Sequence, residues 1–219
     1  MPDVRRSADR FLTEVDGIST RHSFSYGRHY DPDNIGFGAL MAVNDETLAP
    51  GAGYPEHVHA DVEIVTWVLE GTLAHRDATG QDGIVRPGTA QRLSAGEGVR
   101  HSERNASDTE SLRFVQMMLR SHHESAPAYA SVEVPRAPGR LAATVEVAAE
   151  ATLFVAVFDG GERVEVPASP RLLVHVTRGS VVAGSDVLAE GDELRDARDA
   201  PLVLTATSPA EALVWLLSP

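Results

Sequence analysis

Two stretches decide the fold of this chain: residues 51–71, GAGYPEHVHADVEIVTWVLEG, and residues 96–105, GEGVRHSERN. The first contains His57 and His59 and the second contains His101 and Glu103, so each has two metal-binding side chains two residues apart. Side chains two apart in a β-strand point to the same face of the sheet. If the two stretches form neighbouring strands, three imidazoles and one carboxylate converge on one divalent transition metal. A nitrogen and oxygen donor set without thiolate suits Fe, Mn, Ni, Cu or Zn.

The composition excludes several classes of function. The 219 residues include no Cys, which rules out disulfides, thiolate metal ligands and thiol catalysis. Every basic residue is Arg, so no Lys is present to form a Schiff base. The net charge of −13 and the pI near 5.0 argue against a nucleic-acid partner. Because the sequence has neither a secretory leader pattern nor a run of about 18 apolar residues, we expect a cytoplasmic protein with no membrane partner.

The residues around these histidines have the pattern of a small β-domain. Val62–Leu69 (VEIVTWVL) is rich in β-branched and aromatic residues and predicts a buried strand. Glu70 and Gly71 predict a turn, and Thr72–Arg76 is the expected returning strand of a hairpin. Further short strands are predicted at Gln91–Ser94, around His101 and at Leu112–Leu119. Strands at this spacing indicate an all-β barrel or sandwich, which can enclose one small ligand or metal.

The β pattern resumes in the second half, after residues 121–140, which are rich in Ser, Ala and Pro and are interpreted as a linker. Residues 68–73 (VLEGTL) correspond to residues 176–181 (VTRGSV), which indicates an internal repeat. The second copy has neither His-x-His nor His-x-Glu, and its one histidine, His175, has no ligand-type partner two residues away. We therefore predict two antiparallel barrels in tandem, with the metal site in residues 1–120 and no metal ligands in residues 141–219.

Other side chains allow more than one interpretation. Glu63 follows the alternation of His57 and His59, so it is either a further ligand or a residue that supports the ligands, unless a bulge breaks the alternation. Asn105 shares a face with His101 and could hold a ligand or a backbone group in place. The remaining histidines are interpreted as structural or solvated rather than as ligands: His22, His29, His75, His122, His123 and His175. Of these, His22 and His29 could also line the mouth of a pocket.

These motifs resemble those of the cupin superfamily, and specifically those of the pirin family. The first cupin motif is present as a glycine at position 51, the His-x-His pair and a closing glycine at position 71, and the second runs from Gly98 to Asn105. In the general cupin pattern, the glutamate ligand stands where this chain has Ile64, which cannot bind a metal. Pirins take the carboxylate from two residues after the second-motif histidine, which is Glu103 here. The resemblance covers nearly the whole chain.

The resemblance implies a bicupin, with two jelly-roll barrels and a mononuclear iron in the N-terminal one. The ligands that it implies are His57, His59, His101 and Glu103. Some pirins are similar to quercetinases, which cleave flavonols with O₂ and release carbon monoxide. Others bind a transcription factor or a metabolic enzyme as regulators.

The function predicted from this resemblance is a flavonol dioxygenase whose metal is Fe(II). Its partners would be a small oxygenated aromatic substrate and O₂, with no organic cofactor. Glu103 is predicted to act as the general base for the substrate hydroxyl, because a carboxylate can change its denticity at a metal and an imidazole cannot. Two alternatives stay open: a non-enzymatic iron-binding regulator with a protein partner, and a cupin isomerase or decarboxylase acting on another small molecule.

Overall fold

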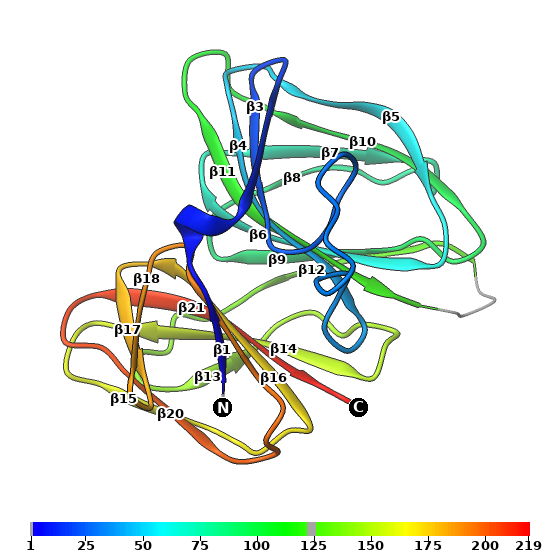
Figure 1. The fold of residues 1–219 in the computed structure, drawn as a ribbon. Coiled ribbons are helices and arrows are strands. Elements are labelled where there is room, and N and C mark those ends of the chain that lie inside the picture. Colours follow the sequence, from blue (N-terminus) through cyan, green and yellow to red (C-terminus); the bar gives the residue numbers. More distant parts are fainter. Residues whose placement is uncertain (1, 122–125) are drawn as a thin grey trace. The chain divides into compact units, whose positions relative to one another are not determined.

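A computed structural model describes residues 2–121 and 126–219, and it confirms the expected all-β fold. The described residues form 21 strands and one three-residue 3-10 helix, Ser7–Asp9 (Figure 1). Among them, no helix has the length and hydropathy that a bilayer crossing requires. His122 and His123, which the sequence analysis interpreted as structural or solvated, lie outside the described ranges.

The chain divides into two compact units. The first unit comprises Phe11–Glu133 and Val147–Ala149, and the second comprises residues 2–10, Val134–Glu146 and Glu150–Pro219. The sequence-based division placed residues 1–120 in one barrel, residues 121–140 in a linker and residues 141–219 in the other barrel. In the structure, the described residues before Phe11 group with the second unit, and much of the predicted linker is assigned to the two units.

The first unit contains two antiparallel sheets. The larger sheet has the strand order β12-β9-β6-β11-β4-β3-β2 and the smaller one the order β5-β10-β7-β8. The larger sheet is built from β2 (Phe11–Val15), β3 (Ile18–His22), β4 (Leu40–Leu48), β6 (Val62–Glu70), β9 (Thr89–Ser94), β11 (Leu112–Arg120) and β12 (Ala128–Glu133). The smaller sheet is built from β5 (Gly53–His59), β7 (Leu73–Asp77), β8 (Asp82–Val85) and β10 (Val99–Asn105).

Among the described residues, apolar clusters fill the interior of the first unit on either side of a band of polar residues. One cluster includes Val68 of β6 together with Leu73 of β7, and the other includes Ile64 of β6 together with Val99 of β10. Between them, at the intervening inward positions of β6 and β10, the side chains are polar: Thr66, His101 and Glu103, all buried. Burying polar groups costs free energy unless they have hydrogen-bond or metal partners. This polar band is therefore the part of the interior in which a functional site is expected.

The predicted hairpin between Val62–Leu69 and Thr72–Arg76 is wrong. β6 pairs with β9 and β11 in the larger sheet, whereas β7 pairs with β8 and β10 in the smaller one. Gly71 has a φ of +79°, and a Cβ there would lie 2.7 Å from the carbonyl oxygen of Ser111. Glycine therefore allows the chain to turn from one sheet into the other. β6 is buried along most of its length because it is a central strand and not the arm of a hairpin.

The second unit repeats this two-sheet plan. Its larger sheet has the order β1-β19-β16-β21-β14-β13 and its smaller one β15-β20-β17-β18. The larger sheet is built from β1 (Asp3–Arg5), β13 (Leu141–Ala143), β14 (Ala151–Phe158), β16 (Arg171–Arg178), β19 (Glu193–Asp196) and β21 (Ala210–Leu217). The smaller sheet is built from β15 (Arg163–Val166), β17 (Ser180–Ala183), β18 (Asp186–Ala189) and β20 (Leu202–Thr205).

The internal repeat is visible in the backbone. Gly179 joins β16 to β17 across the two sheets of the second unit, as Gly71 joins β6 to β7 in the first. Gly179 has a φ of +70°, and a Cβ there would collide with the carbonyl oxygen of Pro209. The interior of the second unit is an apolar cluster that includes Val174, Val181 and Leu204.

Candidate metal centre

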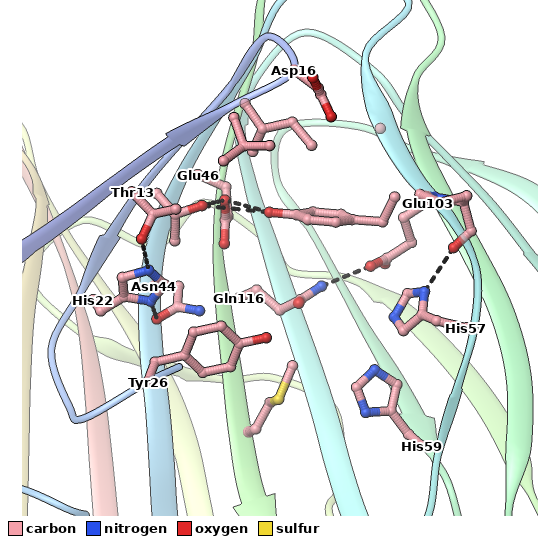
Figure 2. Close-up of a pocket in the computed structure, with 17 residues that line it drawn as sticks. Thr13, Asp16, His22, Tyr26, Asn44, Glu46, His57, His59, Glu103 and Gln116 are labelled. Carbon is pink, nitrogen blue, oxygen red and sulfur yellow. Dashed lines mark hydrogen bonds between the residues drawn. The ribbon is translucent and has the colours of Figure 1, made fainter. Parts of the chain in front are cut away.

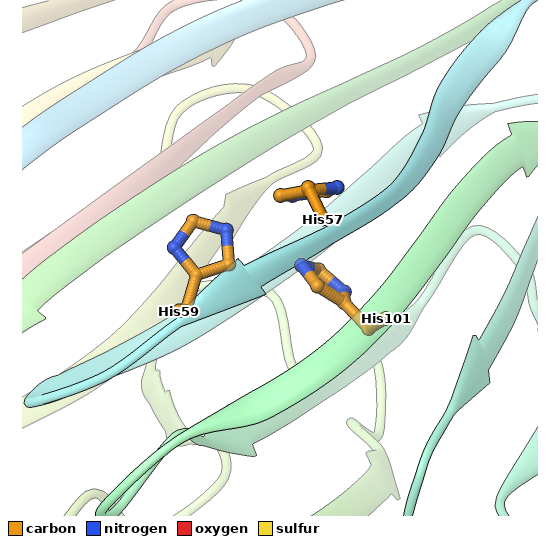
Figure 3. Close-up of side chains that lie close together, drawn as sticks. All are labelled: His57, His59 and His101. Carbon is orange, nitrogen blue, oxygen red and sulfur yellow. The ribbon is translucent and has the colours of Figure 1, made fainter.

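Two neighbouring strands bring the predicted imidazoles together. β5 and β10 pair antiparallel, with His57 opposite His101. The ring centroids of His57 and His101 are 4.4 Å apart, those of His57 and His59 4.8 Å, and those of His59 and His101 5.1 Å. The three rings point toward one another from the two strands (Figure 3). The adjacency that the sequence predicted for these two strands is confirmed.

The unsatisfied nitrogens of this cluster fit a divalent metal ion. One ring nitrogen from each of His57, His59 and His101 lies within 4.8 Å of the other two. His101 is 2% exposed, and among the described residues neither of its ring nitrogens has a hydrogen-bond partner. The Nδ1 atom of His57 lies 2.8 Å from the carbonyl oxygen of Pro55, so its N–H can donate to that oxygen and leave Nε2 for a metal. A buried imidazole with two unpaired nitrogens costs free energy that a metal–nitrogen bond would recover.

The surroundings of His59 and His101 keep these two imidazoles neutral, which is the form that binds metals. Burial, with smaller contributions from the neighbouring histidines, lowers the pKa of His101 to about 4 against the opposing effect of Glu103. Burial also lowers the pKa of His59, with a smaller contribution from His57. At neutral pH both rings therefore have lone pairs available for coordination.

Glu103 adjoins the imidazoles, and two amides hold its carboxylate. Gln91 donates to Oε1 and Gln116 donates to Oε2, each at 2.7 Å. Burial opposes ionisation of Glu103, but the nearby His75 ring, His101 and the Gln116 amide outweigh it, so its pKa lies below the ordinary value. Glu103 is therefore an ionised carboxylate at neutral pH. It belongs to a second group of possible ligands, which it forms with His75 and His101.

His75 is the member of this region that sequence reasoning missed. It lies opposite Glu103 in the pairing of β7 with β10, and its Nδ1 atom is 3.7 Å from Oε1 of Glu103. Its Nε2 atom is 2.9 Å from Oδ2 of Asp77, whose other oxygen accepts from the backbone N–H of Thr79 at 2.8 Å. Burial disfavours the charged ring, but Glu103 and Asp77 together raise the pKa of His75. The signal was available, because His75 and Asp77 have the same two-residue spacing as the other pairs.

Two other candidates lie outside these metal-binding groups. Glu63 is buried on β6, where Oε2 accepts from Ser94 at 2.8 Å and from the backbone N–H of Ala148 at 3.2 Å. Among the described residues, it belongs to neither group of possible ligands. The side-chain amide of Asn105 donates to the carbonyl oxygens of Leu48 and Glu110, at 3.2 and 2.7 Å. Of the two roles left open for Asn105, it therefore has the second, which is to hold backbone groups in place.

A cavity of about 420 Å³ opens beside the cluster in the first unit. His57, His59 and Glu103 line one part of it, and residues of β2, β3 and β4 line another (Figure 2). The sequence favoured a solvated side chain for His22 and left open a place at the mouth of a pocket; His22 is 3% exposed and contributes to this wall. Its ring contacts Thr13 at 3.0 Å and Asn44 at 3.2 Å. The cavity is large enough for a small aromatic ligand.

A buried carboxyl lies in the same wall. Oε2 of Glu46 accepts from the hydroxyls of Thr20 at 2.6 Å and Tyr54 at 2.8 Å. Burial raises the pKa of Glu46 to about 7, although both hydrogen bonds favour the carboxylate. Tyr54 enters the cavity because the register of β5 against β10 shifts: Glu103 pairs with Tyr54, while His101 pairs with His57. This irregularity lets Tyr54 and His57, three residues apart, both line the cavity.

Comparison with known proteins places these observations in a family. A family model described as Pirin matches residues 4–119. A Mycobacterium tuberculosis H37Rv protein named "Putative quercetin 2,3-dioxygenase" is 41% identical over 97% of this chain and 93% of its own length. The quercetin 2,3-dioxygenase of Escherichia coli K12 is 30% identical over 99% of this chain and 98% of its own. The bacterial pirin YhhW from Escherichia coli, in complex with nickel(II), superposes with a TM-score of 0.93 at 29% identity and full coverage of both chains.

Proposed function

This chain belongs to the pirin family, and we propose that it is a metal-dependent flavonol dioxygenase that opens the substrate ring with O₂ and releases carbon monoxide. The observation that carries this proposal is the set of three convergent imidazoles beside a cavity of about 420 Å³. One of the three is buried, and both of its nitrogens are unpaired within the part of the chain that the structure describes. Relatives that share nearly the whole chain have names that describe this activity on quercetin.

We further propose His57, His59, His101 and Glu103 as the ligands and Fe(II) as the metal. Nitrogen and oxygen donors without sulfur also suit Mn, Ni, Cu and Zn, so the donor set alone does not select iron. The metal, when bound, would lower the pKa of the substrate hydroxyl and bring the flavonol and O₂ together. Four protein ligands would leave positions open for both, as catalysis requires.

The residues of this chain would prepare the substrate for that chemistry. The Glu103 carboxylate, ionised at neutral pH, is the proposed acceptor for the proton of the flavonol hydroxyl. Gln91 and Gln116 fix its position through their amide groups. The apolar side chains of Ile18 and Met118 line the cavity and would exclude water from the bound ring.

The test is turnover of quercetin by purified protein that has been stripped of metal and reloaded with Fe(II), Mn, Ni, Cu or Zn in parallel. Loss of flavonol absorbance should match O₂ consumed and carbon monoxide released. His101→Ala should abolish both metal retention and turnover, whereas His29→Ala, which alters a histidine outside the two ligand groups, should retain them. Protein that binds the metals but turns over no flavonol with any of them would refute the enzymatic proposal. That result would favour the metal-dependent regulator.

The ligand set has its own test, because His75 forms an alternative group with His101 and Glu103. Under the proposal, His59→Ala removes a ligand and should abolish stoichiometric metal binding in elemental analysis. His75→Ala removes only a residue that supports Glu103, and it should weaken binding without abolishing it. The reverse order of effects would assign the metal to the alternative group.

A further inference from the structure

The proposed chemistry does not use the buried carboxyl of Glu46, although it faces the same cavity. Both of its hydrogen bonds, from Thr20 and Tyr54, go to Oε2. Among the described residues, Oε1 has no hydrogen-bond partner, and Figure 2 shows this second oxygen turned into the cavity. Glu46 is 3% exposed, so a ligand group that reached Oε1 would meet a fixed and largely dehydrated acceptor.

The position of this carboxyl relative to the three imidazoles suits a ligand made of linked aromatic rings. The ring centroid of Tyr54 lies 6.4 Å from that of His57, and the Tyr54 hydroxyl is bonded to Glu46. The Tyr54 side chain therefore spans from Glu46 to the imidazoles along the wall of the cavity, so a ligand that lies beside it extends over both. A substrate with one ring at the imidazoles and a second ring attached to it would bring the second ring to Glu46.

An aromatic surface lies at the same end of the cavity. Tyr26 lines the cavity and stacks on His22, with ring centroids 4.9 Å apart and an interplanar angle of 14°. His22 is buried and is held by contacts with Thr13 and Asn44, whereas Tyr26 is 58% exposed. The Tyr26 ring thus rests on a fixed support and retains surface for contact with another ring. The sequence, with 5% aromatic residues, gave no indication of such a platform.

The charges at this end of the cavity favour a neutral hydroxyl over an anionic group. Glu46 and Glu103 both line the cavity, and either carboxylate would repel a ligand carboxylate or phosphate. Because burial raises the pKa of Glu46 to about 7, the group can accept a hydrogen bond from a phenol or donate one to it near neutral pH.

We propose a subsite for the pendant hydroxylated ring of a flavonol, the ring that lies farther from the metal. The subsite is formed by Glu46, Tyr54 and Tyr26, and a phenolic hydroxyl of that ring donates a hydrogen bond to Oε1 of Glu46. This inference rests on the proposed function, since it assigns the second ring of the same substrate. It makes Glu46 a specificity-determining residue that selects substrates by the hydroxyls of that ring.

The experiment measures the Kd of the metal-loaded protein without O₂ for two ligands, quercetin and its analogue that lacks hydroxyls on the pendant ring. Glu46→Leu should raise the Kd for quercetin about tenfold, because it removes a hydrogen bond in a dehydrated site. The Kd for the analogue should stay within about twofold. Tyr54→Phe provides the same comparison with a smaller change of structure, and it should weaken quercetin binding alone. Glu14→Gln is the matched control on the exposed face of β2, and it should change neither constant.

The outcomes separate this inference from the proposed function. The subsite is refuted if the wild-type protein binds both flavonols but each variant, Glu46→Leu and Tyr54→Phe, raises the Kd for quercetin and for the analogue by the same factor. In that case the two residues only support the shape of the cavity. Unchanged binding of quercetin by both variants refutes it as well. Wild-type protein that binds neither flavonol overturns the proposed function and the subsite together. Selective loss of quercetin affinity, with thermal unfolding near that of the wild type, supports the subsite.

Discussion

The protonation of Glu46 has a measurable consequence for stability, and Glu46→Gln tests it. Glutamine has the shape of the protonated side chain, and its amide oxygen can still accept from Thr20 and Tyr54. The variant therefore removes the ionisation of Glu46 while it preserves the packing and the hydrogen bonds. Any difference from the wild type that depends on pH reports the cost of a buried negative charge at this position.

The magnitude follows from the pKa of Glu46, which burial raises from 4.5 to about 7 in the folded protein. A carboxyl with a raised pKa is more easily ionised in the unfolded chain, so the folded state loses stability as pH rises from about 4.5 to about 7. Above that pH the loss is constant. At about 1.36 kcal/mol for each pKa unit, we expect Glu46→Gln to be more stable than the wild type by about 1 kcal/mol at pH 5 and by about 3 kcal/mol at pH 8.

The assay is urea unfolding of metal-free wild-type and variant protein at several pH values between 5 and 8. The difference between the two free energies of unfolding isolates Glu46, because other titrating groups are common to both proteins. Glu14→Gln is the control, and its difference from the wild type should stay small across the range because Glu14 is exposed. A difference for Glu46→Gln that does not change between pH 5 and pH 8 would refute the argument that burial holds this carboxyl protonated.

Three further predictions concern the turn, the loops and the support of the metal site. Gly71→Ala should destabilise the protein by more than about 1 kcal/mol, seen as a lower Tm, because the residue has a φ of +79° and the added Cβ would contact backbone atoms. The control is Gly27→Ala, which should cost less because Gly27 has a φ of +54° but a Cβ there would have nothing within 4 Å. Asn105→Asp should lower the Tm more strongly, because a carboxylate cannot donate to the three carbonyl oxygens that the amide holds; an unchanged Tm would contradict this role. His75→Gln should weaken metal binding about 10- to 100-fold in a competition titration without removing the Glu103 carboxylate, and unaltered affinity would exclude His75 as its support.

Part of the candidate site could be read from the sequence because its signal is local. The His-x-His pair at residues 57–59 and the His-x-Glu pair at residues 101–103 each share one face of a strand, whatever the rest of the fold does. Their convergence needed only that the two strands be neighbours, as β5 and β10 are. Gly71 was likewise recognisable as a turn, since its surroundings recur around Gly179.

The rest was decided by contacts between residues far apart in the chain. The alternation that made Glu63 a candidate ligand ends where the chain passes from β5 in one sheet to β6 in the other, so Glu63 has different partners from His59. The predicted hairpin failed for the same reason, because Gly71 joins strands of different sheets.

The sequence by itself determined an all-β chain with a repeated turn and a pair of metal-binding strands. Only the tertiary structure decided that Glu46, Tyr54 and His75 surround the cavity or the ligands, since each reaches its position through strand pairing or an irregularity in register. The physical reason is that the alternation of side chains fixes which face of a strand a residue occupies, whereas burial between two sheets fixes what that face meets.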